Sequence, residues 1–157
     1  MHRFYCPDLG HVAPDSVAAA DLSADPAAVW LQTGEAHHAR RVLRLKPGDA
    51  VTLFGGRGVT AEALIVDWQG GPTLQVTALR RDAPARPFVV LGVAVPKGPR
   101  AEDMVNQLSQ VGADVLIPLS TERSVVDPRD RKLAKFERIA IEAAKQCGRP
   151  FLLDIQP

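Results

Sequence analysis

The sequence has few cysteines, no long apolar run and almost no net charge. Its two cysteines, Cys6 and Cys147, are far apart among 157 residues and form no CxxC pair. This pattern argues against a zinc site or a disulfide scaffold and fits a reducing cytosol. No run reaches the roughly 18 apolar residues that would span a bilayer, and the N-terminus lacks an apolar stretch of signal-peptide length. We therefore predict a cytoplasmic protein with no membrane partner.

The common catalytic and nucleotide-binding motifs are also missing. The sequence contains no GxGxxG after a strand and no GxxxxGK[ST], HExxH or GxSxG,. His37 and His38 have no plausible metal ligand nearby in the sequence, so we predict no metal site. The composition is ordinary for a globular protein, with 46% apolar and 24% charged residues,. A net charge of +1 does not by itself indicate a nucleic-acid partner.

Residues 1–82 have the pattern of a small β-barrel. Short apolar runs at 3–6, 50–54, 59–66 and 73–79 are separated by glycine- and proline-containing turns, and 35–45 has helical spacing,. Several short strands at this spacing are typical of a closed or nearly closed barrel. Residues 83–87 contain two prolines and no apolar periodicity, and we interpret them as a linker.

Residues 88–157 have the pattern of an α/β layer. Apolar runs at 88–95, 115–119 and 151–155 alternate with helical patterns at 101–111 and 131–147,. The run at 88–95 is typical of a strand buried on both faces of a sheet. Because no helix pattern follows the third strand, we expect this α/β domain to be incomplete. The predicted fold class of the chain is therefore α+β, a barrel followed by part of an α/β domain.

A basic segment lies in the predicted helix of the barrel domain. Residues 37–46 contain four cations, two histidines and no acid. On an α-helix His37, Arg40, Arg41 and Arg44 would share one face, which is either an ordinary solvated face or a phosphate-binding surface. The lack of an acid favours phosphate binding, which positions RNA without reading its sequence. The predicted RNA contacts here are His38, Arg40, Arg41, Arg44 and Lys46.

Three polar segments of the second domain are candidates for a further site. Lys97 and Arg100 follow the first predicted strand, and residues 121–124 follow the second. Ligands usually bind at the carboxyl ends of strands in open α/β sheets. Glu142, Gln146 and Arg149 have the i, i+4, i+7 spacing of one helical row. We expect the three segments to converge on one sheet edge, although a charged turn and a salt-bridged helix terminus remain alternatives.

Four segments of the chain resemble one known family. HARRVLRLKPGD, PKGPRAEDMV, PLSTERSVV and RIAIEAAKQCGRP are similar, in order and spacing, to the bacterial 16S ribosomal RNA uridine-N3 methyltransferases of the SPOUT class. The resemblance covers essentially the whole chain. It implies a PUA-like RNA-binding barrel over 1–82 and the first half of the knotted methyltransferase domain over 88–157. It also implies S-adenosylmethionine as methyl donor, 16S ribosomal RNA or the small ribosomal subunit as partner, and a homodimer.

The chain departs from this family in two ways. Gln107 and Gln110 stand where the family usually has a lysine and a glutamate. The GPEGG-like loop and LRTETA-like segment that bind the cofactor do not occur in the 157 residues. The resemblance therefore implies that these residues are one portion of an enzyme and that they contain no cofactor-binding residues. Alone, this portion would be inactive. A non-catalytic RNA-binding protein is the alternative; a small-molecule enzyme is disfavoured by the basic segment.

The reaction that the resemblance implies needs a proton acceptor and a cation. Uracil N3 carries a weakly acidic imide proton and is a poor nucleophile until that proton leaves. A cation near the carbonyl oxygens would stabilise the resulting anion, and methyl transfer then depends on in-line alignment. Arg123 and Arg149 are candidates for the cation, Glu142 for the base or its orienting group, and Lys97, Arg100 and Gln146 for further RNA contacts.

Overall fold

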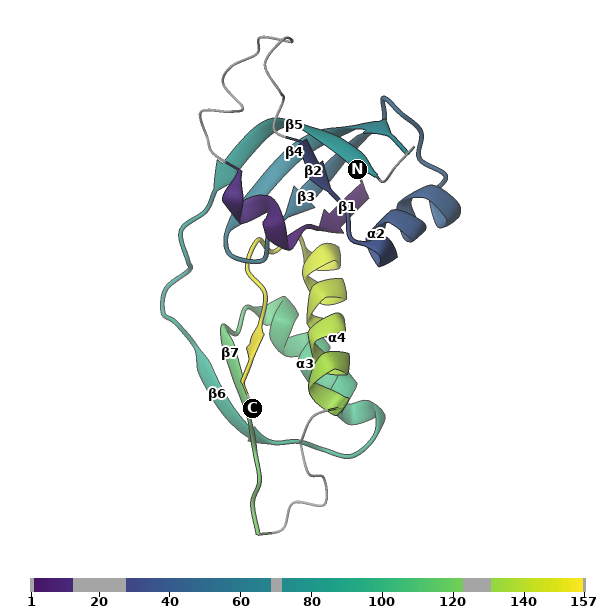
Figure 1. Cartoon of the computed structure of the whole chain (residues 1–157). Coiled ribbons are helices and arrows are strands. Elements are labelled where there is room, and N and C mark those ends of the chain that lie inside the picture. Colours follow the sequence, from purple (N-terminus) through teal and green to yellow (C-terminus); the bar gives the residue numbers. More distant parts are fainter. Residues whose placement is uncertain (1, 13–27, 69–71, 123–130, 157) are drawn as a thin grey trace. The chain divides into compact units, whose positions relative to one another are not determined.

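The chain divides into two compact units, Met1–Ala83 and Pro84–Pro157. The computed structural model describes residues 2–12, 28–68, 72–122 and 131–156 (Figure 1). No helix in these ranges is both long and apolar enough to cross a membrane.

The first unit is an open five-stranded sheet that curves as a half-barrel (Figure 1). The strand order is β1-β3-β4-β5-β2, and every pairing except the parallel β1–β3 pair is antiparallel. The predicted strands at 3–6, 50–54, 59–66 and 73–79 are all present. The short strand β2 and a 3₁₀ turn were not predicted, because neither has a distinctive local pattern. The elements are β1 (His2–Tyr5), the 3₁₀ turn η1 (Pro7–His11), β2 (Ala28–Trp30), β3 (Ala50–Phe54), β4 (Val59–Asp67) and β5 (Thr73–Arg81).

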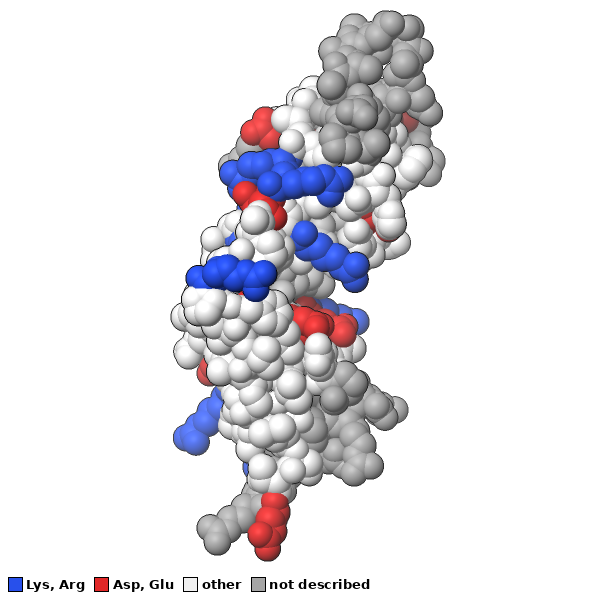
Figure 2. Space-filling view, turned by 90° about the vertical axis from the view of Figure 1, so that its left-hand side faces the viewer, with Lys and Arg blue, Asp and Glu red and all other residues white. Residues whose placement is uncertain are grey.

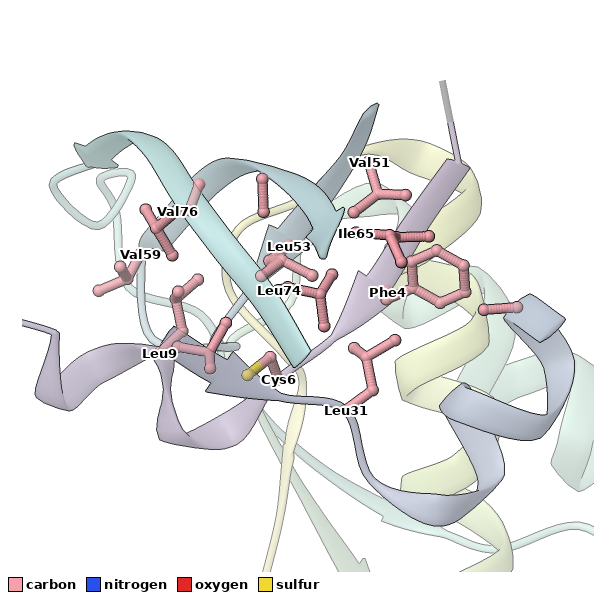
Figure 3. Close-up of a cluster of buried hydrophobic side chains, with 14 residues drawn as sticks. Phe4, Cys6, Leu9, Leu31, Val51, Leu53, Val59, Ile65, Leu74 and Val76 are labelled. Atoms are coloured by element: carbon pink, nitrogen blue, oxygen red, sulfur yellow. The ribbon is translucent and has the colours of Figure 1, made fainter. Parts of the chain in front are cut away.

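The core of the half-barrel comes from alternate strand positions. Phe4 on β1, Leu53 on β3 and Leu74 on β5 are almost fully buried, and their side chains point toward one another (Figure 3). Successive strand residues face opposite sides of a sheet, so their neighbours lie on the outer face. Cys6 belongs to this core; burial, with a smaller contribution from Asp8, raises the pKa of its thiol.

The predicted helix at 35–45 is two different helical turns. An α-helical turn, α2 (Thr33–His37), runs directly into a π-helical turn, η2 (His38–Val42). The Leu43 amide donates to the His38 carbonyl at 3.0 Å, which is the five-residue spacing of a π turn,. Arg44 then adopts a left-handed φ of 57°, which ends the helix,. The wider π turn and this reversal mean that the expected single row of 37, 40, 41 and 44 does not form.

The second unit is a three-stranded parallel sheet with order β6-β7-β8. The predicted strand 115–119 and helix 131–147 have the predicted bounds, whereas the first strand is shorter than 88–95 and the last has only two residues. The crossover helices connect parallel strands, as the alternating pattern predicted. The elements are β6 (Val90–Ala94), α3 (Pro99–Val111), β7 (Val115–Leu119), α4 (Arg131–Cys147) and β8 (Asp154–Ile155).

The helices of the second unit cover one face of its sheet. Val105 on α3, Leu116 on β7 and Phe136 on α4 form a buried cluster, against which Leu91 and Val93 of β6 pack. Figure 1 shows α3 and α4 on the same side of β6 and β7. The side chains of β6 that face the other way are exposed, and Val90 is 50% accessible. The expectation that 88–95 is buried on both faces is therefore wrong within the described residues, because both helices pack on one side.

Candidate nucleic-acid interface

The charged residues of the basic segment in the first unit are exposed to solvent. We call His38, Arg40, Arg41, Arg44 and Lys46 the basic cluster; all five residues are exposed. Ala39 is completely buried between them and anchors the π turn to the core of the half-barrel. The Lys46 amide donates to Asp49 Oδ2 at 2.7 Å, which holds the turn that follows.

The cations of the basic cluster are not neutralised by acidic side chains among the described residues. Arg40, Arg41, Arg44 and Lys46 form no ion pair with any other residue in ranges 2–12, 28–68, 72–122 and 131–156. Elsewhere the charges are mixed: on the face drawn in Figure 2, blue side chains lie close to red ones at several places. The interaction of an anionic polymer with a near-neutral protein depends on such local excess charge, so the basic cluster is the strongest candidate for phosphate contacts.

Lys97 and Arg100 occupy the carboxyl edge of the second unit's sheet. Both are exposed; Lys97 lies in the turn between β6 and α3, and Arg100 lies in the first turn of α3. Gly98, with a φ of 64°, precedes Pro99 at the start of α3, and this left-handed conformation is one that glycine adopts without strain,. Thr121 and Glu122 follow β7. Because β6 and β7 are parallel, the two segments leave the same edge of the sheet, as predicted. Arg123 and Ser124 lie outside the described residues.

The carboxyl end of α4 lies at the opposite edge of that sheet. In a strand–helix–strand crossover the helix returns antiparallel to the strands, so α4 ends where β8 begins,. Glu142 and Gln146 therefore lie near the amino ends of the strands, away from Lys97 and Arg100. The predicted convergence of all three segments on one edge is wrong for this segment. Glu142 and Gln146 are exposed, and Glu142 Oε1 pairs with Lys145 Nζ at 2.8 Å.

Arg149 is separated from that helical row and caps α3. Gly148, with a φ of 75°, ends α4 and turns the chain. Arg149 Nη1 donates to the carbonyl oxygens of Ser109 at 3.1 Å and Ala113 at 3.2 Å. Its Nη2 lies 3.8 Å from Asp114 Oδ1. The last carbonyls of a helix have no partner within it, so the guanidinium satisfies a helix end that would otherwise be open.

Gly112 and Asp114 are two close neighbours of the Arg149 guanidinium. Gly112, the left-handed C-cap of α3, lies under the guanidinium, and an added Cβ would lie 3.6 Å from Arg149 Cζ. Asp114 Oδ2 also accepts a hydrogen bond from the Val89 amide at 2.8 Å. Arg149 therefore joins the ends of α3 and α4 to the start of β7. This role was not predicted, because the contacting carbonyls come from residues about 40 positions earlier in the chain.

Gln107 and Gln110 lie on the exposed side of α3. Both side chains are exposed, and Gln110 Nε2 donates to Asn106 Oδ1. The ion pair between α3 and α4 is formed instead by Glu102 and Lys135. Both glutamines therefore contribute to the surface of α3 and not to the buried core of the unit.

A second feature of the first unit was missed by the sequence analysis. The outer face of the sheet contains a cavity of about 240 Å³. Its lining joins four strands, so no local motif marks it; the available signal was the polar residues alternating with core residues. The residues that line it are Arg3, Thr52, Thr60, Ala61, Glu62, Ala78, Leu79 and Arg80. Elsewhere in the described ranges, no three His, Cys, Asp or Glu residues gather as metal ligands.

Two domain families and several named proteins match this chain. Residues 84–157 match an RNA methyltransferase domain, and residues 31–76 match an RNA methyltransferase PUA domain. Ribosomal RNA small subunit methyltransferase E of Synechocystis is 34% identical over 80% of this chain and 42% of its own length. The Mycobacterium bovis protein of the same name is 31% identical over 82% of this chain and 52% of its own length. The chain belongs to the family of these ribosomal RNA small subunit methyltransferases, which combine a PUA domain with an RNA methyltransferase domain.

Solved structures of similar proteins support the fold class. A probable rRNA-methyltransferase from Porphyromonas gingivalis is 28% identical, with a TM-score of 0.77 over 99% of this chain and 59% of that one. The ribosomal RNA small subunit methyltransferase E of Neisseria gonorrhoeae, bound to S-adenosyl methionine, has a TM-score of 0.79 at 24% identity and matches in fold. These matches confirm a PUA-like sheet followed by part of a SPOUT-type α/β domain. The chain spans about half the length of the curated family members it matches and about 60% of the solved ones.

Proposed function

We propose that this chain is the RNA-binding portion of an S-adenosylmethionine-dependent enzyme that methylates uridine N3 in 16S ribosomal RNA. The exposed basic cluster carries this proposal, because three arginines without ion pairs in the described residues lie on a unit that matches an RNA methyltransferase PUA domain. The curated relatives are named small-subunit ribosomal RNA methyltransferases. Binding of a 16S RNA fragment over a range of salt, with and without those arginines, tests it.

The proposed RNA contacts fall into separate groups. His38, Arg40, Arg41, Arg44 and Lys46 would hold phosphates at the half-barrel. Lys97 and Arg100 would add contacts at the carboxyl edge of β6, where both are exposed. Gln146 is exposed at the other edge of that sheet, so we propose it as a contact distinct from these two.

The proposed catalytic roles differ in their structural support. Arg123 remains a proposed stabilising cation for the uracil anion. Glu142 remains a proposed base or orienting group, and its exposed carboxylate is paired with Lys145. For Arg149 the hydrogen bonds to Ser109 and Ala113 support a positioning role, because a guanidinium occupied by helix-end carbonyls is not free to meet a uracil oxygen.

The described residues at the carboxyl edge of the second unit's sheet do not by themselves fit the cofactor. Lys97, Arg100, Thr121 and Glu122 are all exposed at the sheet's carboxyl edge and do not enclose an adenosine. Small-molecule sites usually bury most of the ligand surface. The GPEGG-like and LRTETA-like segments do not occur in the sequence. These residues therefore do not by themselves assemble a methyl-transfer site.

We expect that the 157-residue protein does not bind S-adenosylmethionine measurably at micromolar concentrations. Isothermal titration calorimetry of the purified chain measures this directly. A Kd in the micromolar range would contradict the expectation and require a cofactor site built from Lys97, Thr121 and their neighbours. A full-length family member titrated under the same conditions is the positive control.

A non-catalytic RNA-binding protein is the second candidate function. The lack of an enclosed cofactor site among the described residues favours it, while the match of 84–157 to a methyltransferase domain favours the enzyme. Transfer of labelled methyl groups to 16S RNA separates the two. Incorporation at uridine N3 by the chain would reject the non-catalytic function.

We also propose that the protein forms a homodimer through its second unit. Val90 on β6 and Leu119 on β7 are 50% and 41% exposed on a sheet face that α3 and α4 do not cover. An open edge strand with apolar side chains is a template for pairing with another chain. Sedimentation is expected to show an average mass that rises with protein concentration, and a Val90→Lys, Leu119→Lys double variant should stay monomeric. A wild-type protein that is monomeric at all concentrations would contradict this.

A further inference from the structure

Two rows of side chains meet on the outer face of the half-barrel. The strand register aligns Arg3, Thr52, Glu62 and Ala78 across β1, β3, β4 and β5. The next row on the same face is Tyr5, Phe54, Thr60 and Arg80. Directly opposed side chains on neighbouring strands are about 5 Å apart at Cβ. The cavity of about 240 Å³ lies over these rows.

The cavity contains a buried hydroxyl that lacks a hydrogen bond. Thr60 lines the cavity and is only 8% exposed. Its Oγ1 has no hydrogen-bond partner among the residues that the structure describes. A buried hydroxyl without a partner is unfavourable, because it has lost its hydrogen bonds to water and gained none in return. A ligand atom that reached Thr60 from the cavity would therefore recover a hydrogen bond that the protein itself does not make.

The other groups around the cavity provide both signs of charge. Glu62 is exposed beside Thr60 and forms no ion pair within the described part of the chain. Arg80 is directly opposite Thr60 across the β4–β5 pair, and its exposed guanidinium lies 3.0 Å from Asp82 Oδ2. Ala78, opposite Glu62, is small and leaves the floor open.

A stacked cation and ring border the same face. The Arg3 guanidinium carbon lies 4.7 Å from the centroid of the Phe54 ring, and Tyr5 packs against that ring at 5.4 Å. The Phe54 ring is itself fully buried, so the group on which an unpaired RNA base could stack is the planar guanidinium of Arg3, which is half-buried,. The face therefore combines a stacking surface, a carboxylate, an unsatisfied hydroxyl and a second guanidinium.

We infer that this cavity binds one unpaired RNA base that has an exocyclic amino group, with cytosine as the smallest such base. The inference rests on the proposed RNA-binding function and identifies which nucleotides flank the bound phosphates. Glu62 would accept from the amino group, as carboxylates do from cytosine N4, and Thr60 would bond to another edge atom. Arg80 would contact the adjoining phosphate. Uracil has a carbonyl oxygen in place of that amino group, so the Glu62 carboxylate would repel it.

The test compares the binding of oligocytidylate and oligouridylate to the whole 157-residue chain. Wild-type protein should prefer oligocytidylate by about tenfold, the usual contribution of one matched base contact. Glu62→Gln, which keeps the shape of the side chain and offers a donor to uracil, should reduce the preference to about twofold or less. Thr60→Val should lower oligocytidylate affinity about fivefold. Arg80→Ala should weaken both oligonucleotides alike and leave their ratio unchanged.

Glu137→Gln is the matched control, because Glu137 is exposed on α4 of the other unit and the change in charge is the same. A Glu62→Gln variant with the wild-type ratio would overturn the base site, while salt-dependent binding of both oligonucleotides would leave the proposed RNA-binding function standing. If neither oligonucleotide nor a 16S RNA fragment binds, both proposals fail. Equal wild-type affinity for the two oligonucleotides would also overturn the base site.

Discussion

Replacing Arg40, Arg41 and Arg44 together by alanine is expected to weaken RNA binding by about a hundredfold at roughly 0.1 M salt. Each phosphate contact that is lost removes about 0.7–0.9 from the slope of log affinity against log salt. Three contacts therefore lower the slope by about two to three. The three side chains are exposed and have no ion pair among the described residues, so the fold should be unaffected. Fluorescence anisotropy with a 16S RNA fragment across a salt series measures both effects.

The matched control removes three arginines elsewhere. Arg57, Arg86 and Arg138 are also exposed, and their joint replacement by alanine changes the formal net charge from +1 by the same three units, to −2. If binding depended only on net charge, both triple variants would lose the same affinity. A cluster-specific effect requires a slope close to that of the wild type in the control. An unchanged slope in the Arg40, Arg41 and Arg44 variant would reject the basic cluster as the phosphate-binding surface.

Arg149→Ala is expected to destabilise the second unit by about 3 kcal/mol. Hydrogen bonds to charged groups contribute about 1.5–3 kcal/mol each, and the substitution removes two, to Ser109 and Ala113. Asp114 would also lose its cationic neighbour while remaining only 12% exposed. Urea unfolding followed by circular dichroism gives the change in the free energy of unfolding. Hydrogen exchange should quicken first at the end of α3 and the start of β7.

Two variants separate the capping role of Arg149 from a catalytic one. Arg149→Lys keeps the charge but cannot reach both carbonyls with the same planar geometry, so we expect an intermediate loss of stability. Arg138→Ala, on the exposed side of α4, should change stability by less than about 0.5 kcal/mol. Wild-type stability in Arg149→Ala, accompanied by loss of methylation in a full-length enzyme, would restore the catalytic assignment.

The local sequence pattern was sufficient to predict the elements whose buried and exposed residues follow a regular period within one segment. Strand 115–119 and helix 131–147 have the predicted bounds. In that helix Phe136, Ala140 and Ala143, which recur at helical spacing, are buried, whereas Cys147 at its end is exposed. The stripe has the period of an α-helix, and one packed face selects one side of it. Four of the five strands of the half-barrel followed from short apolar runs between glycine- and proline-containing turns,.

Elements without a strong period were not predictable from the sequence. β2 has only three residues, and its strand conformation depends on pairing with β5. The helical pattern of 35–45 continues through Leu43, but the chain forms a π turn at His38–Val42 and reverses at Arg44. The packing of Ala39 against the half-barrel core decides this geometry, and that contact is absent from any local window.

The order of residues alone was enough to predict two units, an α+β fold and a group of cations without neighbouring acids. These are properties of composition and short-range order, because burial follows apolar period and charge stays at the surface. Which side chains share a surface became clear from the folded chain alone. The fold separated Glu142 and Gln146 from Lys97 and Arg100, since a crossover helix ends at the opposite edge from where it begins. It also assigned Arg149 to the end of α3 and assembled the outer cavity from four strands, because both depend on contacts between distant residues.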